Sequence, residues 1–270
     1  MESVNFDRAA AYYDATRALP ADTIDRLTAM LAAELRGRQP CLEAGVGTGR
    51  VALPLRRRGI TLAGIDISGA MLRRVAVNAG GHSPFPLVQA DATRLPAATA
   101  TFGSLLAVNV LHLIPGWRLA VDEAVRVVRP GGVLIVSFPG EGGTARQPRQ
   151  PRDAIEAAPW AGAMREALAR HGLSRPPAGA HGPDDLAGYL GRRAARRVLD
   201  PVTVRETQTL GQALDRLERQ IYSWTWPYTP EQVRAVGSDI RTWAARENVV
   251  LHERHVVESE IRWWAFDLAT

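Results

Sequence analysis

The sequence predicts a doubly wound α/β fold, in which a mostly parallel sheet is covered by helices on both faces. Short apolar stretches alternate with amphipathic stretches between residues 41 and 138, as strands joined by helical crossovers do. Several apolar stretches end in an acid or an amide, and glycines crowd the turn after the first stretch. Ligands bind beyond the carboxyl ends of such strands, so the same residues mark the expected site.

Five strands and three helices follow from this pattern. The strands are expected at residues 41–44, 62–66, 85–92, 102–109 and 133–138. The helices are expected at about residues 51–58, 70–79 and 119–128. A tight turn, Arg129-Pro130-Gly131-Gly132, leads into the fifth strand. The polar residues at the carboxyl ends of the first four strands are Glu43, Asp66, Asp91 and Asn109.

The turn after the first strand has the chemistry of a nucleotide cradle. Gly45, Gly47 and Gly49 alternate through it, and glycine both adopts positive φ and lets a ligand lie against the backbone. A helix that starts near Gly49 would direct N–H groups at the same ligand. Asp66 follows about 20 residues after this turn, where a ribose-binding carboxylate is expected.

A dinucleotide-binding oxidoreductase is the competing interpretation of these glycines. Its fingerprint requires Gly or Ala three positions after the second glycine, and Arg50 occupies that position. Glu43, two residues before the first glycine, would also repel a pyrophosphate. The acid instead suits a ligand that carries an ammonium group.

From Phe6 to Phe138 the chain resembles class I S-adenosylmethionine-dependent methyltransferases of the ubiquinone/menaquinone-biosynthesis-like (type 11) group. The match rests on the acid-x-Gly-x-Gly-x-Gly motif, the acid after the second strand, the Asp91-Ala92 pair with its following Leu-x-Pro, and the Arg-Pro-Gly-Gly turn. The resemblance implies a Rossmann-like, seven-stranded sheet whose last strand is antiparallel. It implies S-adenosylmethionine as cofactor and S-adenosylhomocysteine as product. The residues that it places around the cofactor are Tyr13, Arg17, Glu43, Gly45, Gly47, Gly49, Asp66, Ile67, Met71, Asp91, Ala92 and Asn109.

Five segments are expected along the chain. Segment 1–34 is an amino-terminal helical lid over the cofactor, and segment 35–140 is the Rossmann-like core. Segment 141–207 holds a loop, helices (about 153–170 and 183–193) and a sixth strand at 203–207. Segment 208–248 is a helical cap insertion on the substrate side, with helices at 208–220 and 230–246. Segment 249–270 holds the final antiparallel strand, best marked at 261–266.

A few polar and aromatic residues are candidates for contact with the methyl acceptor. His112 follows the fourth strand and is the candidate general base for a hydroxyl acceptor, although it could equally orient its loop by hydrogen bonding. Aromatic residues that could line the acceptor pocket are Trp117, Tyr222, Trp224, Trp226 and Tyr228. The aromatic side chains of the insertion could instead fasten it to the rest of the protein.

Composition and the absence of certain motifs narrow the range of possible partners and substrates. The net charge is +5 without a single lysine, and scattered arginines make nucleic acid an unlikely partner. No ligand-spaced metal cluster, membrane-spanning run or signal-peptide core is evident, so a cytoplasmic, metal-free protein is expected, as monomer or homodimer. The fourth strand lacks the (Asp/Asn)-Pro-Pro-aromatic motif typical of many nucleic-acid and protein methyltransferases. The sequence therefore predicts methyl transfer to an O or N atom, less readily a C atom, of a small molecule. An RNA or protein methyltransferase and a non-catalytic cofactor-binding protein remain the alternatives.

Overall fold

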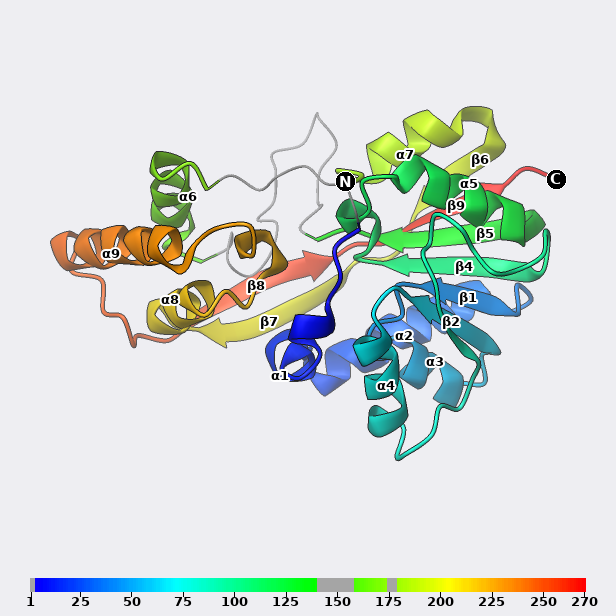
Figure 1. Ribbon diagram of the computed structural model, residues 1–270, viewed down its shortest axis with the longest axis horizontal. Helices are drawn as coiled ribbons and strands as arrows, with labels where there is room; N and C mark the ends of the chain where they lie inside the picture. The colour runs from blue at the N-terminus through cyan, green and yellow to red at the C-terminus, as the bar shows by residue number, and fades with distance from the viewer. Residues whose placement is uncertain (1–2, 140–157, 174–178) are drawn as a thin grey trace. The chain divides into compact units, whose positions relative to one another are not determined.

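The computed structural model describes residues 3–139, 158–173 and 179–270, and the chain divides into two compact units (Figure 1). Unit 1 comprises residues 1–138, 177–202 and 261–270. Unit 2 comprises residues 139–176 and 203–260. The second unit therefore joins two stretches that are separated in the sequence.

Unit 1 is built on a seven-stranded sheet with the order β3-β2-β1-β4-β5-β9-β6. Its strands are β1 (Cys41–Ala44), β2 (Leu62–Asp66), β3 (Leu87–Gln89), β4 (Phe102–Val108), β5 (Val128–Ser137), β6 (Ala194–Val198) and β9 (Trp264–Leu268). The strands β1 to β5 are parallel to one another, whereas β9 runs antiparallel to both β5 and β6. The predicted fold class is confirmed. The strand order reverses between β1 and β4, where such sheets bind their ligands.

Helices cover both faces of this sheet (Figure 1). The helical elements of unit 1 are η1 (Asp7–Ala9), α1 (Tyr13–Arg17), α2 (Ala21–Leu35), α3 (Ala52–Arg57), α4 (Gly69–Asn78), η2 (Leu111–Leu113), α5 (Trp117–Val127), α7 (Pro183–Leu190) and η3 (Gly191–Arg193). Consecutive strand residues enter two separate cores: Leu105 packs with α5 and α7, and Leu106 packs with α2, α3 and α4. Burial on both faces explains why these strands are continuously apolar.

One predicted strand belongs elsewhere. Residues 203–207, expected to complete the main sheet, lie in β7 (Val202–Gln208), which pairs with β8 (His255–Ile261) in a separate two-stranded sheet. The sixth strand of the main sheet is β6, with the sequence Ala-Ala-Arg-Arg-Val. This strand is largely exposed at the sheet edge, so it lacks the apolar pattern that identifies a buried strand.

Unit 2 contains this β7–β8 sheet and the elements α6 (Ala161–Arg170), α8 (Leu210–Glu218), η4 (Ser223–Thr225) and α9 (Pro230–Arg246). The predicted helices at 208–220 and 230–246 are confirmed as α8 and α9. Each begins with a capping box, Thr209 with Gln212 and Thr229 with Gln232, which fixes its first turn. The helix predicted from about residue 153 is found as α6, but residues 158–160 form a turn before it, and residues 153–157 lie outside the described residues. Trp160, buried completely, lies in the core of the unit.

Candidate functional site

The glycine turn lies where the strand order reverses. Gly45, Gly47 and Gly49 all have positive φ, at 70°, 56° and 81°, a conformation that other residues seldom adopt. A Cβ at Gly45 would come within 2.6 Å of the Val110 side chain, which follows β4. A Cβ at Gly47 would meet nothing within 4 Å. The turn is therefore closed by side chains at its first glycine and open at its second.

Glu43 is a buried acid at this turn. It lies on β1 between Gly64 of β2 and Leu106 of β4, and only 2% of its surface is exposed. Its Oε2 is buried and has no hydrogen-bond partner among the described residues. Burial raises the pKa of Glu43 to about 8; the positive charge of Arg50 counteracts this rise and the negative charge of Asp66 adds to it. A carboxyl group buried without a partner fits a site for a cationic group.

Asp66, at the carboxyl end of β2, meets the same turn. Its two oxygens accept hydrogen bonds from the backbone N–H groups of Gly47 (2.9 Å) and Ser68 (2.8 Å). Burial raises the pKa of Asp66, and these backbone bonds oppose the rise. The structure thus brings the first two predicted acids to one turn, although 23 positions separate them in the sequence.

The remaining predicted cofactor residues lie in turns of the same unit. Asp91 accepts hydrogen bonds from the N–H and hydroxyl of Thr93, both at 2.8 Å, and Ala92 lies between these two residues. Met71 is buried in the first turn of α4, and Ile67 accepts a hydrogen bond from Gln89 through its carbonyl.

Asn109 directly follows β4 and has an unusual backbone conformation. Its φ is +49°, in the left-handed region, and Ser137 binds both its N–H and its side-chain oxygen. Asn tolerates this conformation better than most residues. The strand therefore turns sharply at its carboxyl end, directly before Val110 and His112.

The amino-terminal residues 3–17, which we call the N-terminal strap, attach to three loops of unit 1. The Val4 N–H donates to the carbonyl of Leu113 (3.3 Å). Asp7 accepts hydrogen bonds from the Ser68 hydroxyl (2.5 Å) and the Ala70 N–H (3.2 Å).

Asp14 makes the most extensive strap contact. Its carboxylate accepts hydrogen bonds from the Thr48 hydroxyl (2.5 Å) and the Asn78 amide (2.9 Å), and it pairs with Arg74 at 3.4 Å. The predicted residues Tyr13 and Arg17 flank this contact in α1: Tyr13 packs edge-to-face on Phe6. Sequence reasoning missed Asp14, because its partners lie 34 to 64 positions away in the sequence.

The turn that carries His112 is held by a distant segment. The Ala180 N–H donates to the carbonyl of Leu111 (3.1 Å). Gly179 lies so close that a Cβ there would be 2.1 Å from the same carbonyl oxygen. His112 itself is half-buried in η2, and its role as a base stays a prediction.

The predicted aromatic pocket residues lie in two places. Trp117 begins α5, is 6% exposed and packs edge-to-face on Tyr189 in the core of unit 1. The others belong to unit 2. The rings of Tyr222 and Trp224 stack with their centroids 6.2 Å apart, and both Trp224 and Tyr228 pack against the core of the unit. The Trp226 indole N–H donates a hydrogen bond to the Gln220 carbonyl (2.9 Å). Their contact with an acceptor remains a prediction.

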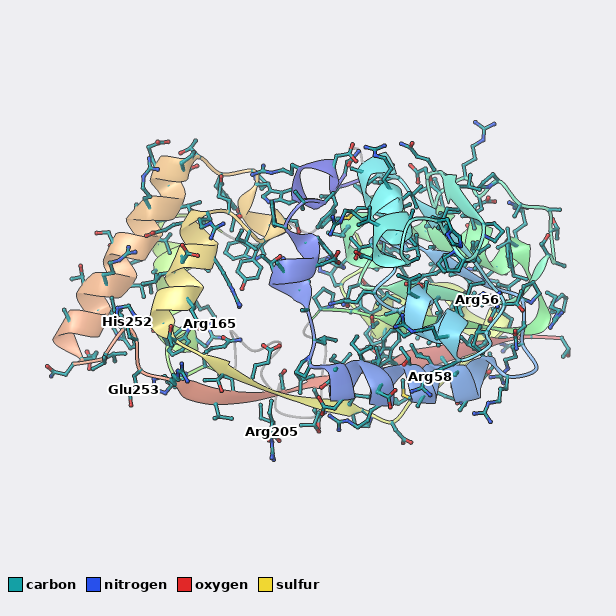
Figure 2. All side chains as sticks on the ribbon, turned by 90° about the horizontal axis from the view of Figure 1, so that it is seen from below. Arg56, Arg58, Arg165, Arg205, His252 and Glu253 are labelled. Atoms are coloured by element: carbon teal, nitrogen blue, oxygen red, sulfur yellow. The ribbon has the colours of Figure 1, made fainter. Side chains whose placement is uncertain are left out.

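Arginines gather in the sequence at residues 56–58 and 192–197, and four of them pair with acids. Arg58 lies beside α2, where it pairs with Asp25 (Figure 2). Arg197 on β6 pairs with both Glu34 and Asp267, which lowers the pKa of each carboxyl group. The other paired members are Arg193 with Asp122 and Arg196 with Asp184. These pairs leave less positive charge for a nucleic-acid surface than the sequence suggests.

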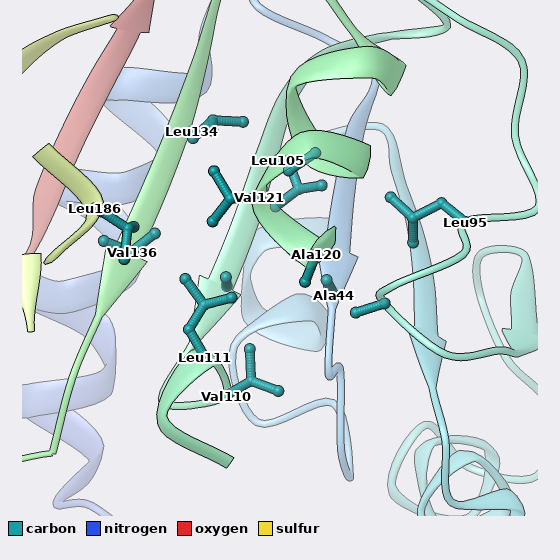
Figure 3. A pocket seen from close by; sticks show the side chains of 13 residues that line it. Ala44, Leu95, Leu105, Val110, Leu111, Ala120, Val121, Leu134, Val136 and Leu186 are labelled. Carbon is teal, nitrogen blue, oxygen red and sulfur yellow. The ribbon is translucent and has the colours of Figure 1, made fainter. Parts of the chain in front are cut away.

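A small cavity lies between the sheet and α5 of unit 1 (Figure 3). It has a volume of about 20 Å³ and is lined only by apolar side chains, among them Leu105, Val121 and Leu134. This space holds little more than one water molecule, so it is a packing defect rather than the cofactor site.

Two features are absent from the residues that the structure describes. Among them, no three His, Cys, Asp or Glu side chains are grouped closely enough to hold a metal ion. No helix in the same ranges has the length and apolar character needed to cross a membrane.

Comparison with known proteins places this site in a family. Residues 42–136 match the family model described as "Methyltransferase domain". The chain is 32% identical over 134 residues to a demethylmenaquinone methyltransferase of Streptomyces avermitilis, covering 48% of this chain and 57% of the relative. It is 29% identical over 183 residues to a malonyl-[acyl-carrier protein] O-methyltransferase of Geobacter sulfurreducens, covering 62% and 68%. A phosphatidylethanolamine N-methyltransferase of Cereibacter sphaeroides is 37% identical over 98 residues, covering 35% and 48%. In the first and third of these comparisons the chain spans about half the length of the relative.

Solved structures share the fold. A protein of Bacillus halodurans C-125 matches with a TM-score of 0.59 and 16% identity, covering 93% of this chain and 100% of the other. The YcgJ protein of Bacillus subtilis matches with a TM-score of 0.54 and 15% identity, with the same coverages. The matched family model spans the glycine turn and the acids Glu43, Asp66 and Asp91. The match over residues 42–136 therefore supports a class I S-adenosylmethionine-dependent methyltransferase domain of the type 11 group.

Proposed function

We propose that this protein transfers the methyl group of S-adenosylmethionine to an oxygen or nitrogen atom, and less readily a carbon atom, of a small-molecule acceptor. One observation carries the proposal: the unpartnered, buried carboxyl group of Glu43 lies at a glycine turn whose middle residue, Gly47, faces open space. An acid in such a position needs a cation, and the amino-acid end of this cofactor has an ammonium group.

The residues of the site fit the cofactor piece by piece. Glu43 would bind the ammonium group, and the open side of Gly47 would let the backbone approach the ligand. Asp66 would bind the ribose hydroxyls, since each carboxylate oxygen has a second lone pair besides the one used by a backbone N–H. Asp91 would meet the adenine amino group. The N-terminal strap, fixed at Asp7 and Asp14, would keep water away from these contacts.

The bound cofactor supplies a methyl group that is already activated by the sulfonium. The chain therefore has to align an acceptor with that methyl group and exclude water, which can account for much of the acceleration. For a hydroxyl acceptor, we assign His112 the role of general base, because it lies in the turn after β4 and imidazole is the side chain that most often transfers protons in catalysis. A nitrogen acceptor needs only to arrive unprotonated.

The small-molecule class is supported by two observations. Three relatives are named for demethylmenaquinone, malonyl-[acyl-carrier protein] and phosphatidylethanolamine, and none of these acceptors is a nucleic acid. The engaged arginines, such as Arg197 with its two acids, argue against RNA. The predicted aromatic residues of unit 2, such as Trp224, are our candidates for the acceptor pocket.

The test has a binding arm and a transfer arm. Calorimetry should detect S-adenosylhomocysteine binding and no competition by a nicotinamide dinucleotide. Incubation with methyl-labelled S-adenosylmethionine should then label at least one member of a panel that contains a phenol, a quinol, a primary amine, an acyl-thioester carboxylate and bulk RNA. Label in RNA alone, or binding without any transfer, would contradict the proposal.

A matched pair of variants locates the cofactor. Gly47→Ala and Gly37→Ala both place a methyl group at a positive φ with nothing within 4 Å, so the backbone strain is comparable. Only Gly47 belongs to the glycine turn. We expect Gly47→Ala to weaken S-adenosylhomocysteine binding at least tenfold and Gly37→Ala to leave it unchanged. Equal affinities would show that the ligand lies elsewhere.

A further inference from the structure

We propose that Arg50 binds the carboxylate of the cofactor's amino-acid end, opposite Glu43. This assignment rests on the proposed function, and it adds a binding residue that neither the glycine motif nor the strap residues Tyr13 and Arg17 supply. Arg50 follows the third glycine directly, so its backbone is fixed by the same turn that forms the cradle.

The guanidinium of Arg50 is already held in place. Its Nη1 donates a hydrogen bond to the carbonyl of Arg17 in the N-terminal strap, at 2.7 Å. The side chain is half-buried, and this is its one hydrogen bond within the described residues. A guanidinium has five N–H donors, so four remain for another partner. A planar group with paired donors matches a carboxylate in geometry and charge.

The charges around the turn are complementary to an amino acid. Arg50 is close enough to Glu43 for its charge to counteract the rise in the pKa of that acid. Even so, the two side chains form no ion pair within 4.0 Å in the part of the chain that the structure describes. A carboxyl group and a guanidinium thus lie near each other without forming an ion pair, and Asp66 is the further acid at this turn.

An α-amino acid carries its ammonium and carboxylate on one carbon atom, so it can bridge such a separated pair. Glu43 would take the ammonium group and Arg50 the carboxylate. Arg50 would also connect the ligand to the strap, because the Arg17 carbonyl already accepts one of its donors. The same contact explains why the third glycine is followed by an arginine rather than by the Gly or Ala of the dinucleotide-binding motif.

The experiment compares two ligands that differ by one group. Calorimetry measures S-adenosylhomocysteine and its decarboxylated analogue, which keeps the adenosine, the sulfur and the amine but has hydrogen in place of the carboxylate. We expect Arg50→Gln to weaken the first ligand about 10- to 100-fold, as lost hydrogen bonds to a charged group do. The affinity for the analogue should change less than threefold. Arg50→Lys, which keeps the charge without the fork, should lie between.

Two further variants serve as controls. Arg57→Gln, at the exposed end of α3, should bind both ligands like the unaltered protein. Arg17→Gln tests the strap arginine: if it alone shows the selective loss, Arg50 is not the carboxylate residue. Equal weakening of both ligands by Arg50→Gln, or no weakening at all, would also overturn the assignment. A circular-dichroism melt of each variant shows whether it is folded. If Arg50→Gln does not fold, the affinities of Arg50→Lys for the two ligands decide whether Arg50 binds the carboxylate.

The outcome differs from a failure of the proposed function. If the unaltered protein binds neither ligand, the cofactor site itself is wrong and this assignment falls with it. If it binds both ligands equally well, only the carboxylate contact is wrong.

Discussion

Replacing Glu43 by Gln should make the free protein more stable and its cofactor binding weaker. The reason is the raised pKa of Glu43, about 8 against an ordinary value of 4.5. Below pH 4.5 the group is protonated in both the folded and the unfolded chain, so folding carries no penalty. Between pH 4.5 and 8 the unfolded chain loses this proton and the folded protein keeps it, so stability falls as pH rises.

The size of the effect follows from the same values. The pH of 7 lies about 2.5 units above the ordinary pKa of 4.5, and each unit corresponds to about 1.36 kcal/mol. The free energy of unfolding at pH 7 is therefore roughly 3 kcal/mol lower than it is below pH 4.5. Gln has nearly the same shape and does not titrate, so the variant avoids the penalty. For a unit of this size, that difference raises the melting temperature by about 6–12 °C.

The assay is thermal unfolding of both proteins at pH 5, 7 and 8, with and without S-adenosylhomocysteine. We expect the free variant to melt close to the unaltered protein at pH 5 and well above it at pH 8. The ligand should stabilise the unaltered protein more than the variant, because only ionised Glu43 neutralises the ammonium group. A melting difference that is the same at every pH, or a variant that is less stable at pH 8, would refute the reasoning.

Three other predictions concern contacts around the site and the sheet. Asp14→Ala removes the strap contacts to the glycine turn and to α4, so S-adenosylhomocysteine should dissociate about tenfold faster in stopped-flow displacement; an unchanged rate would show that the strap does not control release. Gly179→Ala forces a Cβ against the Leu111 carbonyl and should lower the free energy of unfolding in urea by about 1–3 kcal/mol. The control Gly188→Ala lies in open space on α7, and it should leave that free energy unchanged or raise it by up to about 1 kcal/mol. Arg197→Ala should cost about 1 kcal/mol at pH 7. That loss should shrink as pH falls below about 4, because the pKa values of its two acid partners are lowered in the folded state; a loss that is independent of pH would count against the pairing.

The parallel half of the sheet and the glycine turn could be predicted because their signals are local. Each buried strand is a short apolar run, and Gly45 to Gly49 need only their own backbone conformation. The edge strand β6 could not be found in this way, since Arg196 and Arg197 face solvent and acids rather than a core. Residues 203–207 were correctly predicted as a strand, but so short a segment does not show which sheet it joins.

The site could be predicted only in part, for a related reason. Glu43 is the next-to-last residue of β1 and Asp66 is the last residue of β2, so their positions in the sequence mark them. The strap contact of Asp14 and the bond from Arg50 to the Arg17 carbonyl join residues more than 30 positions apart. Neither has a motif of its own, because a carboxylate or a guanidinium gains its partner only when the chain folds back.

The place of the last strand has a consequence for how the molecule is made. β9, at the carboxyl end of the chain, lies between β5 and β6 rather than at the rim of the sheet. Until synthesis reaches Trp264, β5 has an open side and β6 has no neighbour to hold it. During translation the nascent methyltransferase domain therefore exposes an unpaired strand edge, a surface that favours association with other chains. Truncation before Trp264 would remove β9 from the sheet, so β6 would lose its only neighbour in this sheet and β5 would keep only β4.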